Sequence, residues 1–389
     1  MKKKVNAKLV MLEHSKAKVE LYTSYLATYL TILARTPYVD TVHIYDLMCG
    51  EGIYSDGSKG SPIVTMEKIK EHYFQNNKTC PNLHIWFNDK DKSEIENDKY
   101  KVERVQQKCS KIYCPSNVNV SFRKEDYTQI SLDVVYELES LSNKERALIF
   151  IDPYGYKEVK PDQLKRFLRN GKTEVILFLP ISFMSRVANK SLSQDFFPGG
   201  KPLKEFLLPL FEFDKKFQYS TKPTIFINQL KYLLSKFLQD EKIFVDTFTI
   251  QRDEQNIYCL FFFTHHILGF EKMLETKWKL DEEQGKGFRL NSEQGMLFRE
   301  VEISEYPNKL KNYILLEKAK TNADLYLFGL NNGFLPRHTN QVLKNWQHDN
   351  PKFKVYLKDG TEARKGAFYI NYENYSKKTK QIVKFSFEK

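Results

Sequence analysis

The sequence predicts an α/β protein with a Rossmann-like, seven-stranded sheet and a helical insertion, followed by a C-terminal winged-helix domain. Short apolar runs that end in acids or glycine turns alternate with helical patterns up to about residue 180. Two further apolar runs, at 244–251 and 258–263, are separated by a polar turn. We therefore expect one domain over 1–295, with an insertion at 185–240, and a second over 296–389.

Composition favours a globular protein with a polyanionic partner. Apolar residues make up 41% of the 389 residues, and 61 Lys and Arg against 49 Asp and Glu leave a net charge of +12. The five cysteines are an odd number and form no C-x-x-C pair, so we expect reduced thiols and a cytoplasmic location. Cys109 and Cys114 lack nearby histidines at ligand spacing, so we expect no metal site. The apolar runs are too short to span a bilayer, and we expect no membrane association.

A helix is predicted over residues 7–35, because apolar residues recur at steps of three and four and Pro37 ends the pattern. The helix leads directly into the first strand. His14 and Lys18, near its start, would then reach toward a cofactor or substrate. The alternative is the solvated basic end of an amphipathic helix.

The stretch IYDLMCGEGIYSDGSKGSP at 44–62 is read as a strand that ends in a glycine loop, followed by a helix from Ser61 to about residue 75. Glycines let main-chain N–H groups approach a nucleotide-like cofactor closely. Asp46-x-x-x-Gly50-x-Gly52 is the form that this loop takes for S-adenosylmethionine (SAM), with Cys49 inside it. The alternative is an ordinary strand-to-helix turn.

Two more strands, at 83–87 and 118–122, also end in acids, and a helix is predicted at 92–109 between them. Asp89 follows the first of these strands, where an acid can accept hydrogen bonds from ribose hydroxyls. Asp126 follows the second, where an acid can accept from an adenine amino group, with Tyr127 available to stack. Each acid has an alternative role as a helix cap.

The fourth strand, at 147–151, is continuously apolar and ends in Asp152, Pro153 and Tyr154. Asp-Pro-aromatic at this place is typical of enzymes that methylate exocyclic amino groups. A ring-conjugated amino group is a poor nucleophile, so a carboxylate and a carbonyl must orient it while an aromatic ring holds the base. The alternative is a turn that only shapes the backbone.

A fifth strand is predicted at 175–179, and the insertion after it has helical patterns at 203–210 and 225–238 around a turn at 198–200. The insertion is either a substrate-recognition element or a packing cap. The last two strands, at 244–251 and 258–263, would form a closing hairpin, which distinguishes a methyltransferase sheet from a plain dinucleotide-binding fold.

The tail carries much of the basic charge, with 16 Lys and Arg against 9 Asp and Glu in 301–389, an excess of 16 − 9 = 7. A capping box at Thr321 and Asp324 predicts one helix, a turn at Gly329 and Gly333 follows, and Pro336 begins a second helix. Strands at 353–357 and 367–370 complete a predicted winged helix. Its expected nucleic-acid contacts are Arg337, Gln341, Lys344, Arg364 and Lys365. The alternative is a winged helix used for protein contact.

The order of these elements resembles the class I SAM-dependent methyltransferases, and more narrowly the three-Cys-motif partner protein (TcmP) family. The matching pieces are the leading helix with Lys18 and Tyr25-Leu26, DLMCGEGIYSDG with GSP, FIDPYGY at 150–156, and the closing hairpin that runs into FFFTHHILGFEKM. The resemblance implies SAM as cofactor, bacterial or mobile-element origin, and a protein partner that bears three cysteines.

The predicted function is SAM-dependent methylation of nucleic acid, DNA or RNA, at an exocyclic amino group of a base. The alternative is a catalytically silent module that binds nucleic acid or a protein partner in a phage-defence or mobile-element system. A nuclease or deaminase is a weaker alternative, because the sequence has no clustered set of metal ligands.

Overall fold

The computed structural model describes residues 10–75, 80–153, 155–192, 200–212, 218–252, 256–280, 287–289, 296–316, 320–377, 379 and 381–388. The chain forms two compact units. The first unit contains residues 1–269 and 286–290, and the second contains 270–285 and 291–389. The chain therefore passes from one unit to the other more than once.

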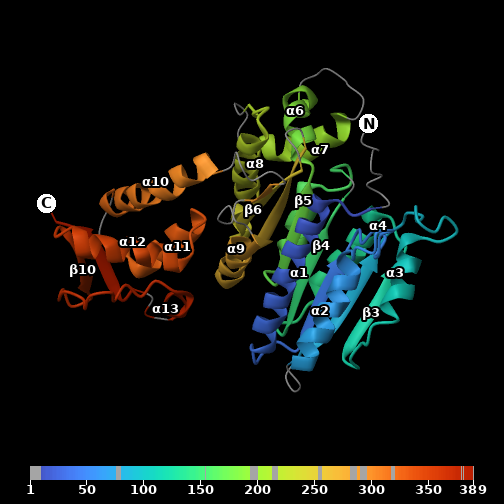
Figure 1. Ribbon diagram of the computed structural model, residues 1–389, viewed down its shortest axis with the longest axis horizontal. Helices are drawn as coiled ribbons and strands as arrows, with labels where there is room; N and C mark the ends of the chain where they lie inside the picture. The colour runs from blue at the N-terminus through green and yellow to red at the C-terminus, as the bar shows by residue number, and fades with distance from the viewer. Residues whose placement is uncertain are drawn as a thin grey trace. The chain divides into compact units, whose positions relative to one another are not determined.

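The first unit is built on a mixed sheet with the order β3-β2-β1-β4-β5-β7-β6-β8 (Figure 1). Its strands are β1 (Thr41–Asp46), β2 (Asn82–Asn88), β3 (Val118–Arg123), β4 (Glu145–Ile151), β5 (Thr173–Leu179), β6 (Phe244–Gln251), β7 (Ile257–Thr264) and β8 (Gly287–Arg289). The pairs among β1 to β5 are parallel, whereas β7 is antiparallel to both β5 and β6. The seven predicted strands and the closing hairpin are confirmed. The eighth strand, β8, was not predicted; it pairs parallel to β6.

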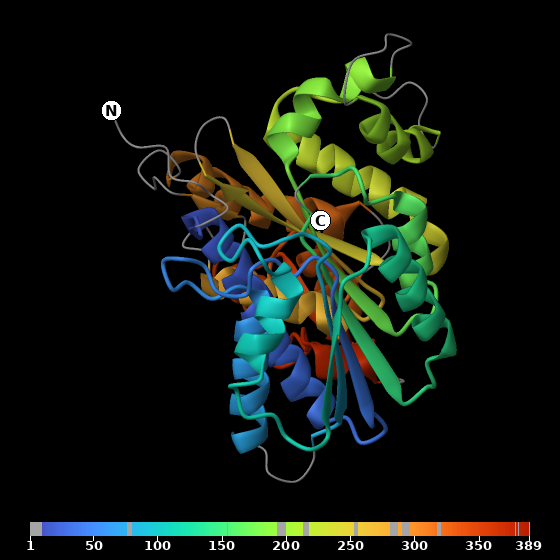
Figure 2. The same ribbon diagram turned by 90° about the vertical axis from the view of Figure 1, so that its right-hand side faces the viewer.

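Helices cover both faces of this sheet. Figure 2 shows α1 (Glu13–Ala34), α2 (Ser61–Gln75) and α3 (Lys101–Cys109) on one face, and α4 (Tyr127–Ser140) and α5 (Pro161–Leu168) on the other. Burial on two faces explains why every residue of β5 is buried and why β4 has a continuous apolar run. The expected α/β fold with a Rossmann-like sheet is thus confirmed.

The predicted helix at 92–109 is wrong over its first half, since α3 begins at Lys101. The Glu51 carboxylate accepts hydrogen bonds from Ser93 Oγ and from Glu94 N–H, each at 2.8 Å. These bonds hold residues 93 and 94 in a loop. A side-chain acceptor that binds a backbone N–H in this way offers that group an alternative to a helical hydrogen bond.

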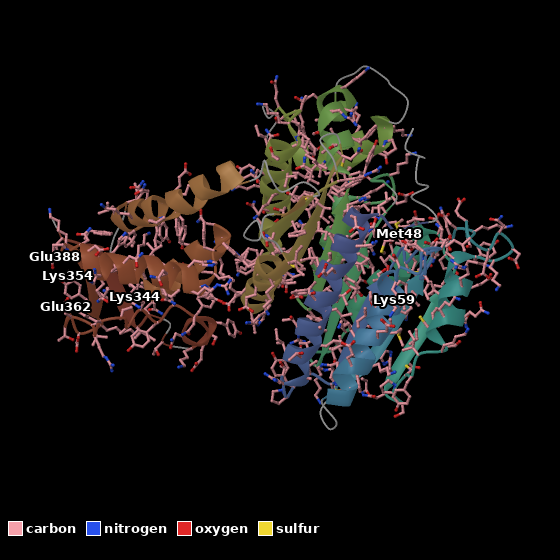
Figure 3. All side chains as sticks on the ribbon, in the orientation of Figure 1. Met48, Lys59, Lys344, Lys354, Glu362 and Glu388 are labelled. Carbon is pink, nitrogen blue, oxygen red and sulfur yellow. The ribbon has the colours of Figure 1, made fainter. Side chains whose placement is uncertain are left out.

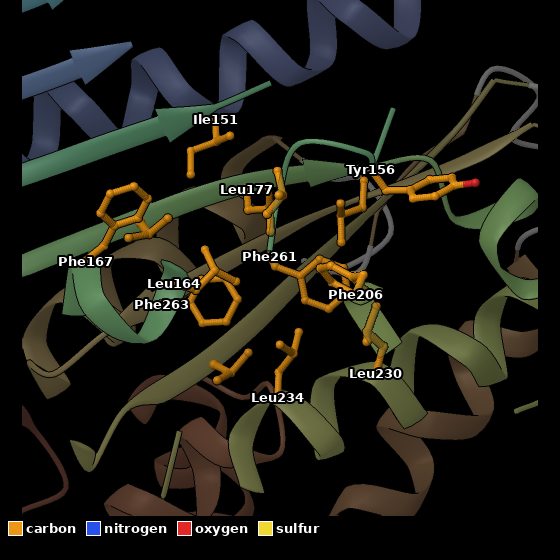
Figure 4. Packing of buried hydrophobic residues seen from close by; sticks show 14 of the residues in the cluster. Ile151, Tyr156, Leu164, Phe167, Leu177, Phe206, Leu230, Leu234, Phe261 and Phe263 are labelled. Carbon is orange, nitrogen blue, oxygen red and sulfur yellow. The ribbon is translucent and has the colours of Figure 1, made fainter. Parts of the chain in front are cut away.

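The insertion contains α6 (Ile181–Leu192), α7 (Gly200–Phe211), α8 (Pro223–Phe237) and the short 3-10 helix η1 (Gln239–Glu241). The two predicted helical patterns are confirmed as α7 and α8, but α6 was not predicted. Figure 4 shows Phe206 of α7 and Leu230 of α8 packed with Phe261 of β7 in one apolar core. Pro198 and Gly199 of the predicted turn lie outside the described residues, and Gly200 begins α7.

The second unit combines helices with a small antiparallel sheet of order β10-β11-β9. Its elements are α9 (Ile267–Leu280, whose first three residues belong to the first unit), α10 (Met296–Leu315), β9 (Lys320–Thr321), α11 (Asn322–Asn331), α12 (Pro336–Asp349), β10 (Phe353–Leu357), α13 (Tyr372–Ser376) and β11 (Val383–Phe387). The predicted capping box is confirmed, because Thr321 Oγ1 accepts from the N–H of Asp324 while the Asp324 carboxylate accepts from the N–H of Thr321.

Two predictions for the second unit are wrong. The strand that pairs with β10 is β11, not residues 367–370, which form no strand. Residues 367–370 are continuously apolar and residues 383–387 alternate, and both patterns are compatible with a strand. Gly329 lies inside α11 and not in a turn. A side chain is disfavoured there, because an added Cβ would be 2.7 Å from Thr339 Oγ1 of α12. Gly333, with φ +83°, does lie in the turn.

No helix among the described residues is long and apolar enough to cross a membrane. The five cysteines, all among the described residues, form no disulfide bond.

Candidate functional site

The glycine loop after β1 requires glycine at two positions. Gly50 and Gly52 have φ values of +68° and +72°, in the left-handed region that other residues avoid. An added Cβ at Gly52 would be 2.9 Å from Val105 Cγ2, and the Gly52 carbonyl accepts from the N–H of Gly60 at 2.6 Å. The loop is therefore tight, and α3 packs directly against it.

Asp46, the last residue of β1, is a fully buried acid with one unmet oxygen. Ser61 Oγ donates to its Oδ2 at 2.6 Å. Its Oδ1 has no hydrogen-bond partner among the described residues. Burial raises the pKa of the Asp46 carboxyl to about 7, and the nearby charges of Asp152 and Asp89 add to the rise. An unmet buried oxygen is costly, so this carboxylate is suited to a positively charged or N–H ligand group.

Asp89 follows β2 and connects the glycine loop to the neighbouring strand. Its Oδ2 accepts from Gly50 N–H at 3.0 Å and its Oδ1 from Asp91 N–H at 2.9 Å. Lys101 Nζ lies 3.9 Å from Oδ1. Burial raises the pKa of Asp89, against the opposing effect of Lys101. Each oxygen keeps lone-pair capacity for a further donor.

A cavity of about 620 Å³ opens at the carboxyl ends of β1, β2 and β3. It is large enough for a small ligand of nucleotide size. Met48, labelled in Figure 3, is one of the lining residues. The full lining is Leu47, Met48, Glu51, Asn88, Asp89, Lys90, Asp91, Lys92, Glu94, Lys101, Glu125, Tyr127 and Glu158. Of the predicted cofactor residues, Asp89 lines the cavity, whereas Asp46, Cys49, Gly50 and Gly52 do not. These four lie in the same loop as the lining residues Leu47, Met48 and Glu51.

At the end of β3, the structure places Asp126 at the N-cap of α4. Its carboxylate accepts from Thr128 N–H at 2.9 Å and pairs with Lys90 Nζ. These bonds lower the pKa of this exposed carboxyl, the Lys90 bond most strongly. Its sequence neighbours Glu125 and Tyr127 line the cavity. The predicted contact from Asp126 to an adenine remains a prediction.

Asp152 follows β4 and forms an ion pair with Lys18 of α1 through its Oδ2. Lys18 Nζ also lies 4.6 Å from the ring centroid of Phe178 on β5. The Phe178 ring stacks on Tyr258 at 5.2 Å, and Tyr258 stacks on His14 at 4.9 Å. Thus His14 and Lys18, one helical turn apart, join α1 to the carboxyl ends of the sheet. Pro153 is buried, and Tyr154 lies outside the described residues.

A buried ion pair connects the glycine loop to α3. Arg104 of α3 pairs with Glu51 of the loop, and both side chains are almost fully buried. Cys49 is buried too, and burial raises the pKa of its thiol well above the ordinary value.

The sequence predicted neither Glu51 nor Arg104, because a pair 53 residues apart has no local pattern. Lys101, Glu125 and Tyr258 were also missed as site residues; the position of Glu125 directly after a strand was the available signal.

The predicted nucleic-acid residues of the second unit lie on its surface. Arg337, Gln341 and Lys344 are exposed on α12, and Gln341 donates to Asn345 Oδ1 at 2.9 Å. Arg364 and Lys365 are exposed in the connection from β10 to β11. This connection is held against α12 by a hydrogen bond of 2.9 Å from Gly366 N–H to Gln347 Oε1. The structure therefore places the two basic sets on adjoining elements.

In the part of the chain that the structure describes, no group of three or more His, Cys, Asp or Glu side chains is arranged to hold a metal ion.

The fold is that of a class I methyltransferase. Its signature is a sheet of order 3-2-1-4-5-7-6 in which only the seventh strand is antiparallel, with a glycine loop after the first strand. No protein-family model matches the sequence, and no curated protein matches it.

Solved methyltransferase structures show only a distant likeness. Trm1 from Pyrococcus horikoshii with S-adenosyl-L-methionine is 11% identical with a TM-score of 0.31, over 67% of this chain and 58% of that one. The O-methyltransferase from Bacillus cereus in complex with SAH is 11% identical with a TM-score of 0.29, over 62% and 80%. A putative O-methyltransferase from Klebsiella pneumoniae is 12% identical with a TM-score of 0.28, over 66% and 94%. The chain thus spans less than two thirds of the Trm1 length. The fold assignment rests on the strand order.

Proposed function

We propose that the chain is a SAM-dependent methyltransferase that acts on an exocyclic amino group of a nucleic-acid base. The observation that carries the proposal is the cavity at the carboxyl ends of β1 to β3, beside two left-handed glycines and a buried acid with an unmet oxygen. In open α/β sheets, ligands bind at this edge.

The residues around the glycine loop are suited to SAM. Gly50 leaves room for a ligand close to the backbone, because the nearest atom to an added Cβ there is Tyr54 Oη at 3.9 Å, while Gly52 permits the tight turn against Val105. Oδ1 of Asp46, which has no hydrogen-bond partner among the described residues, can accept from an ammonium group. Asp89 lines the cavity and can accept from hydroxyl groups. SAM, when bound, supplies a methyl group activated by a sulfonium. Cys49 and Asp126 complete the proposed set.

Asp152 is proposed to orient the amino group that receives the methyl. Lys18 engages Oδ2, which leaves Oδ1 as the acceptor for a substrate N–H. The Lys18 charge also offsets the cost of a partly buried carboxylate. An amino group conjugated to a ring is uncharged, so no proton has to be removed before it attacks the methyl group. The acceptor therefore serves mainly to orient the amino group. The Pro153 carbonyl and Tyr154 keep their predicted roles in this proposal.

The second unit is proposed to bind the nucleic acid. Two consecutive helices, α11 and α12, with β9 before them and β10 and β11 after them in one antiparallel sheet, are consistent with a winged helix. In a winged helix the second helix contacts the nucleic acid. Arg337, Gln341, Lys344, Arg364 and Lys365 would provide the contacts. The TcmP-type protein partner implied by the resemblance, the defence role and the cytoplasmic location remain predictions.

Transfer of tritiated methyl groups from SAM to DNA and RNA tests the proposal. We expect label in one of the two with the wild-type chain. Asp152→Ala should lower the rate about 100-fold or more, because it removes the acceptor that orients the amino group. SAM affinity, measured by calorimetry, should stay within about threefold of wild type, since Asp152 is proposed to contact only the substrate.

Asp162→Ala is the matched control, because Asp162 is an exposed acid at the start of α5. This variant should retain wild-type transfer. A chain that binds SAM but labels neither DNA nor RNA contradicts the proposed substrate, and a chain that does not bind SAM contradicts the proposed cofactor.

A further inference from the structure

Tyr369, in the connection from β10 to β11, has an unusual backbone conformation. Its φ is +56°, in the left-handed region that residues other than glycine adopt rarely. Its side chain is 39% exposed, whereas its neighbours Phe368 and Ile370 are buried at 4% and 2%. A strained backbone persists only where the surrounding structure fixes it, and such residues cluster at functional sites.

Two amide side chains fix the backbone at Tyr369. Asn322, the first residue of α11, donates to the Tyr369 carbonyl at 3.3 Å. Asn340 of α12 donates to the Ile370 carbonyl, also at 3.3 Å. Among the described residues, the Tyr369 ring stacks on no other aromatic ring. The two bonds therefore fix the backbone at Tyr369 and leave its side chain partly exposed.

Exposed cations lie on the elements that hold Tyr369. On α12, Asn340 is three residues after Arg337 and four before Lys344, so the three share one side of the helix. Figure 3 shows Lys344 on this helix. Arg364 and Lys365 precede Tyr369 in the same connection. An exposed aromatic ring and cations on the same elements are complementary to a strand that carries both bases and phosphates.

We propose that Tyr369 stacks on an unpaired base of the bound nucleic acid, while the basic residues of α12 and of the 364–365 segment contact the flanking phosphates. The inference rests on the proposed function, because it specifies how the nucleic-acid substrate is held. Stacking on a base is tolerant of sequence, so Tyr369 would strengthen binding without selecting a base.

The test compares Tyr369→Gly with Tyr369→Phe in the full chain. Fluorescence anisotropy measures binding to a labelled single-stranded oligonucleotide and to the same sequence as a duplex. We expect Tyr369→Gly to weaken single-strand binding about tenfold, and Tyr369→Phe to stay within about twofold of wild type. Glycine accepts positive φ, so the thermal midpoint of Tyr369→Gly should be no lower than that of wild type, which separates lost stacking from unfolding.

Salt dependence separates stacking from charge. Lys365→Gln should reduce the slope of log K against log salt by about 1, whereas Tyr369→Gly should shift the affinity at every salt concentration without changing the slope. Tyr136→Ala is the control, because Tyr136 is a more exposed tyrosine on α4 in the first unit. Tyr136→Ala should leave the affinity for the single strand and for the duplex unchanged.

Unchanged single-strand affinity in Tyr369→Gly overturns the inference and leaves the proposed substrate standing. Equal losses for the duplex and the single strand overturn the assignment to an unpaired base. If the wild-type chain binds neither DNA nor RNA in any form, the inference falls together with the nucleic-acid part of the proposed function.

Discussion

A buried acid lies at each end of the parallel strands of the large sheet, Asp46 at the carboxyl ends and Glu174 at the amino ends. The hydrogen bonds of these two acids differ. Near the start of β5, Glu174 accepts from Tyr25 Oη at 2.5 Å and from Thr264 Oγ1 at 2.6 Å, so both its oxygens have partners. At the end of β1, only one oxygen of Asp46 has a partner among the residues that the structure describes. Burial raises the pKa of each carboxyl to about 7. A raised pKa is thus common to both ends, and the unmet oxygen distinguishes the proposed binding end.

Exchange of each acid for its amide should separate the two roles most clearly. Asp46→Asn should weaken SAM binding about 100-fold, equivalent to ~2.7 kcal/mol, because it removes the negative charge that would pair with the ammonium group. Glu174→Gln should leave SAM affinity unchanged. Isothermal titration with SAM measures both. Equal losses in the two variants would mean that the acids act only through the stability of the sheet.

The pH dependence of stability should reveal both acids. An acid whose pKa rises on folding stabilises the fold while it is protonated, so its contribution is complete below about pH 4 and is lost as the pH rises to about 7. Each amide variant should flatten the fall in stability between pH 5 and 7, by at most ~1.4 kcal/mol per pH unit. Urea unfolding over this range measures the change. A steeper fall in either variant would contradict these pKa directions.

Methyl groups added at two glycines should also have different effects at the two ends. Gly52→Ala should cost about 1–2 kcal/mol through its left-handed backbone, and should weaken SAM binding because the loop must shift away from Val105. At Gly269 an added Cβ would overlap Oε1 of Glu174. Gly269→Ala should therefore cost about 1–2 kcal/mol of stability without loss of SAM affinity. Chemical denaturation and calorimetry on both variants give the comparison.

The smallest expected effect is at Ser61. Ser61→Ala removes the donor to Asp46 Oδ2, so we expect about 1 kcal/mol of lost stability. It should also raise the pKa of Asp46 further, because the Ser61 bond favours the charged form. SAM binding should then require a higher pH than in wild type. An unchanged pH profile of binding would exclude Asp46 as the group that titrates.

Local sequence patterns were sufficient to predict strands β1 to β7 of the large sheet and the acids at their carboxyl ends. Asp46, Asp89 and Asp152 each end a parallel strand, and the carboxyl ends of such strands meet at one edge. The position of Asp126 after β3 was equally clear in the sequence. Its exposed side chain and its bond to Lys90 were not, because strand order says nothing about side-chain direction within the following loop.

Pairs between distant segments could not be predicted. Lys18 and Asp152 are 134 residues apart, and a helical pattern does not specify which basic residue of α1 reaches the sheet. The prediction of a helix over the first half of 92–109 was wrong because of a contact between distant segments. Glu51 of the glycine loop accepts hydrogen bonds from residues 93 and 94. The strand partner of β10 was also missed, because the chain returns to it only at residue 383.

The repeated passage of the chain between its two units affects how it can be divided. Helix α9 lies mostly in the second unit, where Trp278 Nε1 donates to the Gly333 carbonyl at 3.0 Å, yet β8 afterwards returns to pair with β6. A single cut near residue 295 would leave Trp278 on the wrong fragment and separate it from its partner. Neither half is then expected to be fully stable alone, so each unit is best studied by substitution within the intact chain.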